Sequence, residues 1–199
     1  MILADTVEYK FRRPLNQKQS PSCSTHAFLG MLAELVENKT GENTDFDYLG
    51  EFESMEEMRK NKRRLSYLLS KGSQGFKTLD DRLVKVKAYK RAGKYFSGTK
   101  TAERICRDLQ LIGPMLTKIR LHKNTSLTKC GFNKVLKKIS GEWTRSTHAI
   151  VITGFNLKRE TFIIQNSWGL KKSYREIKWK DFVKIFREGY FIKTISITD

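Results

Sequence analysis

Four side chains of this sequence could together perform nucleophilic catalysis, namely Cys23, His148, Asn166 and Gln17. A cysteine nucleophile needs a base that takes its proton, a group that holds this base in the right tautomer, and donors for the oxyanion that forms on attack. A thiol, an imidazole and two carboxamides can fill these roles. The residue types therefore indicate a thiol hydrolase, provided that the fold brings them together.

The segment that contains Cys23 has the pattern of a helix start. A polar run with a proline, from Asn16 to Ser22, gives way to apolar residues at helical spacing, and Gly41 follows the end of the pattern. The apolar positions are Phe28, Leu29, Met31, Leu32, Leu35 and Val36. We therefore expect Cys23 on the first turn of a buried helix, where the helix dipole and the unpaired backbone N–H groups favour a thiolate.

His148 and Asn166 are predicted to lie at neighbouring strand ends. His148 opens an apolar, β-branched run that ends at Gly154, and Glu160–Gln165 is a second such run after a polar turn. The two runs predict a β-hairpin whose second strand leads directly to Asn166. The amide oxygen of Asn166 could then accept the imidazole N–H of His148 while the other ring nitrogen faces the thiol.

Gln17 and Trp168 are further candidates in the same segments. Gln17 lies six residues before Cys23, on the predicted loop into the helix, and its amide N–H groups could point at the oxyanion. Trp168 could cover the hydrogen bond between histidine and asparagine from water. This chemistry needs no metal or organic cofactor, and the three cysteines and three histidines lack the paired spacing of a zinc site.

At these residues the chain resembles the papain family of cysteine peptidases. The family has the order glutamine, cysteine, histidine, asparagine, with the glutamine six residues before the nucleophile and the asparagine in an Asn-Ser-Trp-Gly motif. The same order stands here as Gln17, Cys23, His148 and the run from Asn166 to Gly169. The resemblance implies that these residues are catalytic and that the substrate is a polypeptide.

The resemblance also implies the fold, an α+β papain-like fold of two lobes. Residues 12–98 would form an N-terminal helical lobe with the nucleophile helix, and the periodic segments near Met55–Ser70 and Thr78–Tyr89 would supply further helices. Residues 1–11 and 99–199 would form a C-terminal antiparallel β-barrel-like lobe that carries the histidine and the asparagine. The active-site cleft would lie between the lobes. Leu109–Leu121 is similar to the helix and strand that precede the histidine in the family.

The sequence also departs from the family pattern. The second cysteine and the tryptophan that usually follow the nucleophile are absent, and Thr147 replaces the acidic or amide residue that often precedes the histidine. The glycine pair of the family's substrate cleft has no clean counterpart. Gly72 and Gly75 are the nearest candidates, and Gly75 and Ala149 are our expected supporting residues of the cleft. Residues 171–187 form an insertion whose apolar residues predict a short amphipathic surface helix.

The sequence thus predicts a cysteine-type peptidase that hydrolyses peptide bonds through a thioester intermediate. Two alternatives stay open. One is acyl transfer or isopeptide cleavage with the same residues, and the other is a catalytically weak protein that binds a protein or nucleic-acid partner. His26 is an alternative base, but a residue three positions along the same helix is held too rigidly to meet the thiol of Cys23, so we expect a core or cleft-lining histidine.

The net charge of +18 over 199 residues is not explained by the resemblance. Basic residues gather in three segments, Arg59–Arg64, Lys85–Arg91 and Lys134–Lys138. Such clusters attract acidic proteins, nucleic acid or an anionic membrane surface, although a solvated basic face is the commoner explanation. The charge therefore predicts an anionic partner only as an alternative.

Cysteine usage and the N-terminus bear on localisation. Cys23, Cys106 and Cys130 could form at most one disulfide beside the nucleophile, and Cys106 falls in a helical pattern typical of a reduced, buried thiol. The first residues carry no signal peptide, and no apolar run is long enough to span a membrane. We expect a cytoplasmic protein, which would suit a viral or bacterial origin. The sequence begins some twenty residues before Cys23, without the long inhibitory N-terminal segment typical of the family, so we expect either that processing has occurred or that activity is restrained in another way.

Overall fold

The computed structural model describes residues 2–11, 23–54, 65–92, 98–122, 143–167 and 174–198. Its helices are α1 (Cys23–Thr40), α2 (Tyr48–Ser54), α3 (Leu65–Gln74), α4 (Gly98–Ile112) and α6 (Trp179–Ile185). Its strands are β1 (Thr6–Glu8), β2 (Phe76–Lys77), β3 (Leu83–Ala92), β4 (Met115–His122), β5 (Trp143–Asn156), β6 (Thr161–Gln165), β7 (Tyr174–Lys178) and β8 (Phe186–Thr198). Gln17 and Trp168 lie outside the described residues.

Helix α1 is the central helix of the N-terminal half. It begins at Cys23 and is buried over most of its length, with its apolar side chains packed against β5, α2 and α3. Gly41 ends the helix with a φ of 76°, and its N–H donates to the carbonyl oxygen of Glu37 at 2.8 Å. The predicted helix start at Cys23 and the predicted stop at Gly41 are both confirmed.

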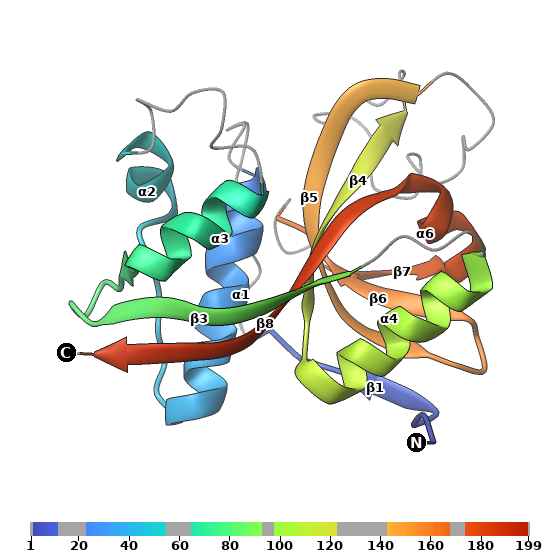
Figure 1. The fold of residues 1–199 in the computed structure, drawn as a ribbon, viewed down its shortest axis with the longest axis horizontal. Helices are drawn as coiled ribbons and strands as arrows, with labels where there is room; N and C mark the ends of the chain where they lie inside the picture. Colours follow the sequence, from blue (N-terminus) through green and yellow to red (C-terminus); the bar gives the residue numbers. More distant parts are fainter. Residues whose placement is uncertain are drawn as a thin grey trace.

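The strands form one antiparallel sheet in the order β2-β3-β8-β4-β5-β6-β7, and β1 pairs with β5 at its end. This path does not return to its first strand, so the sheet is open rather than a closed barrel. Figure 1 shows β3 and β8 running side by side from the left side to the middle of the molecule, where β8 continues into the other half. Helices α1, α2 and α3 lie in the first half, and α4, α6 and β4 to β7 lie in the second. The result is an α+β fold of two lobes.

Two hydrophobic cores correspond to these two halves. The first combines α1 and α3 with side chains from one face of the sheet, including Ala149 and Val151. The second combines α4 and α6 with side chains of the other face, including Ile150 and Ile152. Strand β5 is thus buried on both faces, which explains why its sequence is a continuous apolar run rather than an alternating one. The proposed division of the chain at residues 12–98 stays a prediction.

The hairpin and the helix-then-strand unit are confirmed, and one predicted helix is wrong. Strands β5 and β6 pair antiparallel, and α4 is followed directly by β4. The segment Thr78–Tyr89, predicted as helical, instead contains most of β3. Its buried residues Val84 and Val86 alternate with lysines, so they share one face of a strand and pack in the first core. Pairing with β8 over nearly its full length settles the strand conformation.

The insertion also holds more structure than the sequence predicted. Strand β7 pairs with β6, and α6 follows it as the predicted short helix. Phe182 and Ile185 of α6 are buried in the second core, and Trp179 packs on Phe162. Helix α6 is therefore a packed part of the second lobe and covers it next to α4 (Figure 1).

Candidate active site

Cys23 is the first residue of α1, and its thiol lies beside His148 and Ala149 within β5. The residue is a free cysteine and is partly exposed. Its sulfur receives hydrogen bonds from the His148 ring, from the backbone N–H of Ala149 and from the Ser24 hydroxyl. The contact between α1 and β5 thus joins two segments that are far apart in the sequence.

His148 and Asn166 form the second half of the arrangement. The Nε2 atom of His148 lies 2.7 Å from Oδ1 of Asn166, and each residue is only 1% exposed. The pairing of β5 with β6 places them together, since Val151 is opposite Gln165 in the register. Because the Asn166 amide oxygen accepts a hydrogen bond from Nε2, the tautomer is fixed and Nδ1 is the ring nitrogen left to face the thiol.

The surroundings of Cys23 change the acidity of its thiol. Burial is the largest influence and raises the pKa of Cys23. The hydrogen bond and the positive charge of His148 lower the pKa, and the Ala149 N–H and the Ser24 hydroxyl lower it further. The balance brings the pKa of the Cys23 thiol from 9.0 to about 7. A substantial share of the sulfur is therefore thiolate at neutral pH, which is the nucleophilic form.

The described residues bring together Cys23, His148, Ala149 and Asn166 of the predicted site. Gln17 and Trp168 lie outside the described residues, so their roles stay predictions. Ser24 was missed by sequence reasoning, although its place beside the nucleophile on the first helical turn is the signal that could have found it. A hydroxyl has one O–H donor, which can donate to a thiolate.

Gly75 terminates α3, and Gly72 lies where α3 packs closely against its neighbours. Gly75 follows the last residue of α3 with a φ of 115°, and its N–H donates to the carbonyl oxygen of Lys71 at 3.1 Å. A Cβ at Gly72 would lie 3.0 Å from Val86 and 3.1 Å from Phe28, so the helix approaches α1 and β3 closely there. These contacts account for both glycines through packing and helix termination. A role of Gly75 in the cleft stays a prediction.

His26 and Cys106 have the structural places expected of them. His26 is buried, and its ring stacks on Tyr48 with centroids 5.2 Å apart. Cys106 is a buried free thiol in α4. Burial, and then the charge of Glu103, raise the pKa of Cys106 to about 12. Of the two described cysteines, Cys23 therefore has a lowered thiol pKa and Cys106 a raised one.

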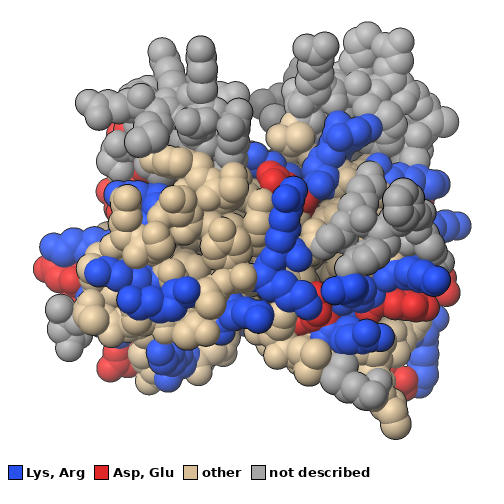
Figure 2. All heavy atoms as spheres, in the orientation of Figure 1, with Lys and Arg blue, Asp and Glu red and all other residues tan. Residues whose placement is uncertain are grey.

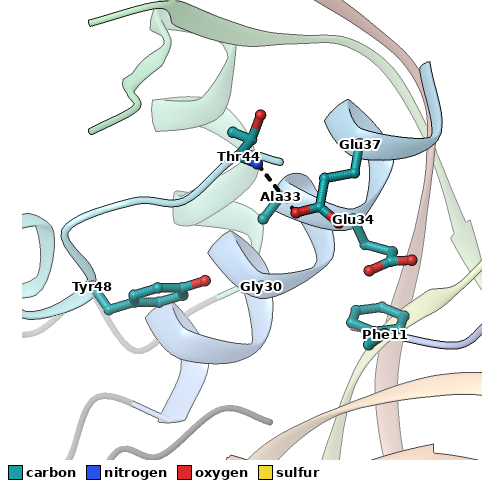
Figure 3. Close-up of a pocket in the computed structure, with 7 residues that line it drawn as sticks. All are labelled: Phe11, Gly30, Ala33, Glu34, Glu37, Thr44 and Tyr48. Carbon is teal, nitrogen blue, oxygen red and sulfur yellow. Dashed lines mark hydrogen bonds between the residues drawn. The ribbon is translucent and has the colours of Figure 1, made fainter. Parts of the chain in front are cut away.

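A small hollow beside α1 is separate from this arrangement (Figure 3). It has room for about one water molecule, and Phe11, Gly30, Ala33, Glu34, Glu37, Thr44 and Tyr48 line it. The Oε1 atom of Glu37 accepts a hydrogen bond from the backbone N–H of Thr44 at 3.1 Å. Gly30, the lining residue of α1 nearest to Cys23 in sequence, lies roughly 10 Å along the helix from it, at about 1.5 Å per residue. The hollow is therefore no part of the thiol site.

Within the described ranges, no group of three or more His, Cys, Asp or Glu side chains is arranged to hold a metal ion. Among the helices of the same residues, none is both long and apolar enough to cross a membrane.

Comparison with known proteins decides the family. A model of the Peptidase_C39 like family matches residues 16–193, which is most of the chain. The chain belongs to this family. No match was found among curated protein sequences. The matched range spans both halves of the site, from the segment before Cys23 to the β8 strand, and so the family assignment covers the whole arrangement.

Solved structures of cysteine proteases share the fold of this peptidase. Xylellain, a cysteine protease from Xylella fastidiosa, aligns with a TM-score of 0.70 and 12% identity over 97% of this chain and 87% of its own. A cysteine protease from Carica candamarcensis aligns with a TM-score of 0.64 and 14% identity over 95% and 98%. Digestive procathepsin L 3 of Tenebrio molitor aligns with a TM-score of 0.70 and 11% identity over 98% and 71%. The peptidase therefore has a papain-like fold.

The acidity of Cys23 gives a pH-dependent prediction for alkylation by iodoacetamide. Because the folded protein lowers the pKa of this thiol to about 7, the rate should rise as the pH passes through 7 and level off above it. Cys106 should stay unlabelled over the same range because its pKa is raised to about 12. Mass mapping by peptide reports each cysteine separately. A rise centred near 9, the ordinary value, would contradict the assignment.

Proposed function

We propose that this peptidase hydrolyses peptide bonds with Cys23 as nucleophile, His148 as general acid and base, and Asn166 as the residue that orients His148. The observation that carries the proposal is the continuous chain of contacts from the Cys23 sulfur through the imidazole to the Asn166 amide, together with a thiol pKa of about 7. The family supplies a polypeptide as the class of substrate.

The reaction follows from the roles of these groups. The Cys23 thiolate, paired with the His148 imidazolium, attacks the peptide carbonyl carbon and forms a tetrahedral oxyanion. Collapse breaks the C–N bond, His148 protonates the leaving amine, and the acyl group stays on sulfur as a thioester. His148 then takes a proton from water, which attacks the thioester, releases the carboxylic acid and restores the thiol. No oxidant or cofactor enters the balance.

The oxyanion needs donors at the place where its charge develops. The backbone N–H of Cys23 is one donor of the proposed mechanism, because Cys23 begins α1 and the first N–H groups of an α-helix have no partner within the helix. The side-chain amide of Gln17 is the other, and its position six residues before the nucleophile supports this role. Each such donor contributes roughly 10²- to 10³-fold in kcat in enzymes of this kind.

A peptide-library digestion combined with inhibitor labelling tests the proposal. Purified protein under reducing conditions should hydrolyse peptides to products with a free carboxyl terminus and a free amino terminus at the cleaved bond. A peptide epoxide should modify Cys23 alone. Transfer of the acyl group to an added amine in preference to water would instead favour the acyl-transfer alternative. Neither cleavage nor labelling by a folded protein, over a pH range that spans the Cys23 pKa of about 7, would favour a binding protein.

Asn166 gives a separate prediction about positioning. Asn166→Ala removes the acceptor of the 2.7 Å hydrogen bond, so the His148 ring loses its fixed tautomer and orientation. We expect kcat for a cleaved peptide to fall roughly 10²-fold with little change in KM, because the orientation matters in the transition state. Asn166→Asp keeps an oxygen acceptor in place and should retain more activity than Asn166→Ala. Equal losses in the two variants would contradict the positioning role.

A further inference from the structure

The strand next to His148 brings two cationic residues to the reactive centre. In the register of β4 and β5, Lys118 is opposite Ala149 and Arg120 is opposite Thr147. These two partners on β5 flank His148, and the backbone N–H of Ala149 contacts the Cys23 sulfur. Directly opposite residues of an antiparallel pair project to the same side, with Cβ atoms about 5 Å apart. Lys118 and Arg120 therefore share the face on which Ala149 approaches the thiol.

Strand β8 adds a further cation to this face. Lys118 is opposite Glu188 on β8, and an irregularity of the register follows at Arg187. The Lys118 Nζ lies 3.8 Å from the Glu188 Oε1, and the Tyr190 hydroxyl also contacts the Glu188 carboxylate. One carboxylate is thus shared between these neighbours. Arg187 comes next in the chain, at the bulge that re-aims side chains beside it.

Arg120 and Arg187 lie close enough to repel each other. The pKa of Arg187 is lowered, first by burial and then by the charge of Arg120. Among the described residues, neither guanidinium is in an ion pair with a carboxylate. Two like charges close together disfavour each other's charged form, and an anionic group between them would relieve the repulsion. The nearby Glu188 carboxylate is paired with Lys118 instead. A guanidinium is also well shaped to bind a carboxylate through two hydrogen bonds.

The surface view agrees with an unbalanced charge near the middle of the molecule. Figure 2 shows Lys and Arg side chains on either side of a small acidic area between the two halves. Acidic residues are far fewer than basic ones over this face, in keeping with 39 Lys and Arg against 21 Asp and Glu in the sequence. The positive charge thus extends to the region where the lobes meet.

We propose that Arg120 and Arg187 bind an acidic side chain of the polypeptide substrate, close in sequence to the bond that Cys23 attacks. This rests on the proposed function, because it takes the site of attack to be Cys23. Arg120 is opposite Thr147 on the face of β5 that carries Ala149, whose backbone N–H contacts the thiol. Arg187 lies close enough to be affected by the charge of Arg120, so a substrate bound along this face would meet both residues. The residues determine specificity and take no part in the bond-breaking step.

Paired substrates and inhibitors test this directly. Each cleaved peptide is made again with a Glu or Asp near the scissile bond changed to Gln or Asn, which gives a pair of one acidic and one neutral peptide. Both peptides of a pair are also made as epoxide inhibitors, and the rate at which each inhibitor labels Cys23 is measured. For at least one position, we expect kcat/KM and the labelling rate to be about tenfold higher for the acidic member at low salt. Salt of about 0.5 M should reduce the difference to about threefold or less, because the Debye length becomes shorter than about 5 Å.

Variants of the two arginines assign the effect. The double variant Arg120→Gln/Arg187→Gln should bring the acidic and neutral members to within about twofold, whereas Lys87→Gln, an exposed position on β3, should leave the preference unchanged. Arg120→Glu/Arg187→Glu should favour a lysine at the same position. Iodoacetamide alkylation of Cys23 checks that the thiol stays activated in every variant.

The outcomes separate this proposal from the proposed function. Cleavage and Cys23 labelling without any acidic preference, or a preference that survives in the double variant, would overturn the proposal and leave Cys23 catalysis intact. No cleavage and no labelling with any member of the pairs would reject Cys23 as the nucleophile and the proposal with it. A preference that disappears only in the arginine variants would support the assignment.

Discussion

Cys23→Ala is expected to abolish peptide hydrolysis, while Cys106→Ala leaves it nearly unchanged. The first substitution removes the only described thiol whose pKa is lowered, to about 7. The second removes a buried thiol whose pKa is raised to about 12 and which takes part in packing α4. We expect a loss of about 10⁴-fold or more in kcat/KM, because without the thiol no acyl-enzyme can form.

The comparison of the two cysteines separates chemistry from folding. Both variants change a cysteine to the same residue, and kcat/KM for one cleaved peptide is measured beside thermal unfolding of each. Cys106→Ala should lower the stability by about 1 kcal/mol, since a small buried side chain is truncated. Cys23→Ala should unfold at about the temperature of the unmodified protein. Hydrolysis that persists in Cys23→Ala would place the nucleophile elsewhere in the chain.

His148→Ala should cause two linked losses. The substitution removes both the hydrogen bond and the positive charge that lower the pKa of Cys23, but leaves the thiol surrounded by protein. The thiol pKa should therefore rise to its ordinary value or above, and alkylation near pH 6 should slow about tenfold, since loss of thiolate outweighs the greater nucleophilicity of a more basic sulfur. Hydrolysis also loses its acid and base, so kcat/KM should fall about 10⁴-fold or more.

His26 provides the matched control for this experiment. It lies three residues from Cys23 on the same helix, but is buried against Tyr48. His26→Gln should leave the pH dependence of Cys23 alkylation centred near 7, even where packing is weakened. A shift caused by His26→Gln and absent from His148→Ala would exchange the roles of the two histidines.

The catalytic candidates could be predicted because their signals are local. The helix start at Cys23 and the apolar run that begins at His148 are both visible in a few neighbouring residues, and the order of the motifs linked them. The predicted strand end at His148 is wrong, because β5 begins at Trp143 and His148 lies within it. The hydrogen bond between His148 and Asn166 then follows from one hairpin register. Nothing beyond this short-range pattern was required to place the two side chains together.

The parts that could not be predicted depend on pairing between distant strands. The alternation of Val84 and Val86 with lysines fitted a strand as well as a charged helix face, and contact with β8 decided between them. The register that places Arg120 beside Thr147 also depends on β4 and β5 meeting across a long separation in sequence. The charged residues around a reactive centre are thus set by the pairing of strands, and they cannot be predicted from any single segment of the sequence.

The thioester on Cys23 is the central claim, and trapping it is the most direct measurement. The peptidase is mixed with a peptide ester, quenched in acid within the first turnover, and digested for mass spectrometry. The account predicts the acyl mass on the peptide that contains Cys23, its removal by hydroxylamine as expected for a thioester, and its absence from His148→Ala. Product formed by the unmodified protein with no acyl group on Cys23 at any time of quenching would contradict the account.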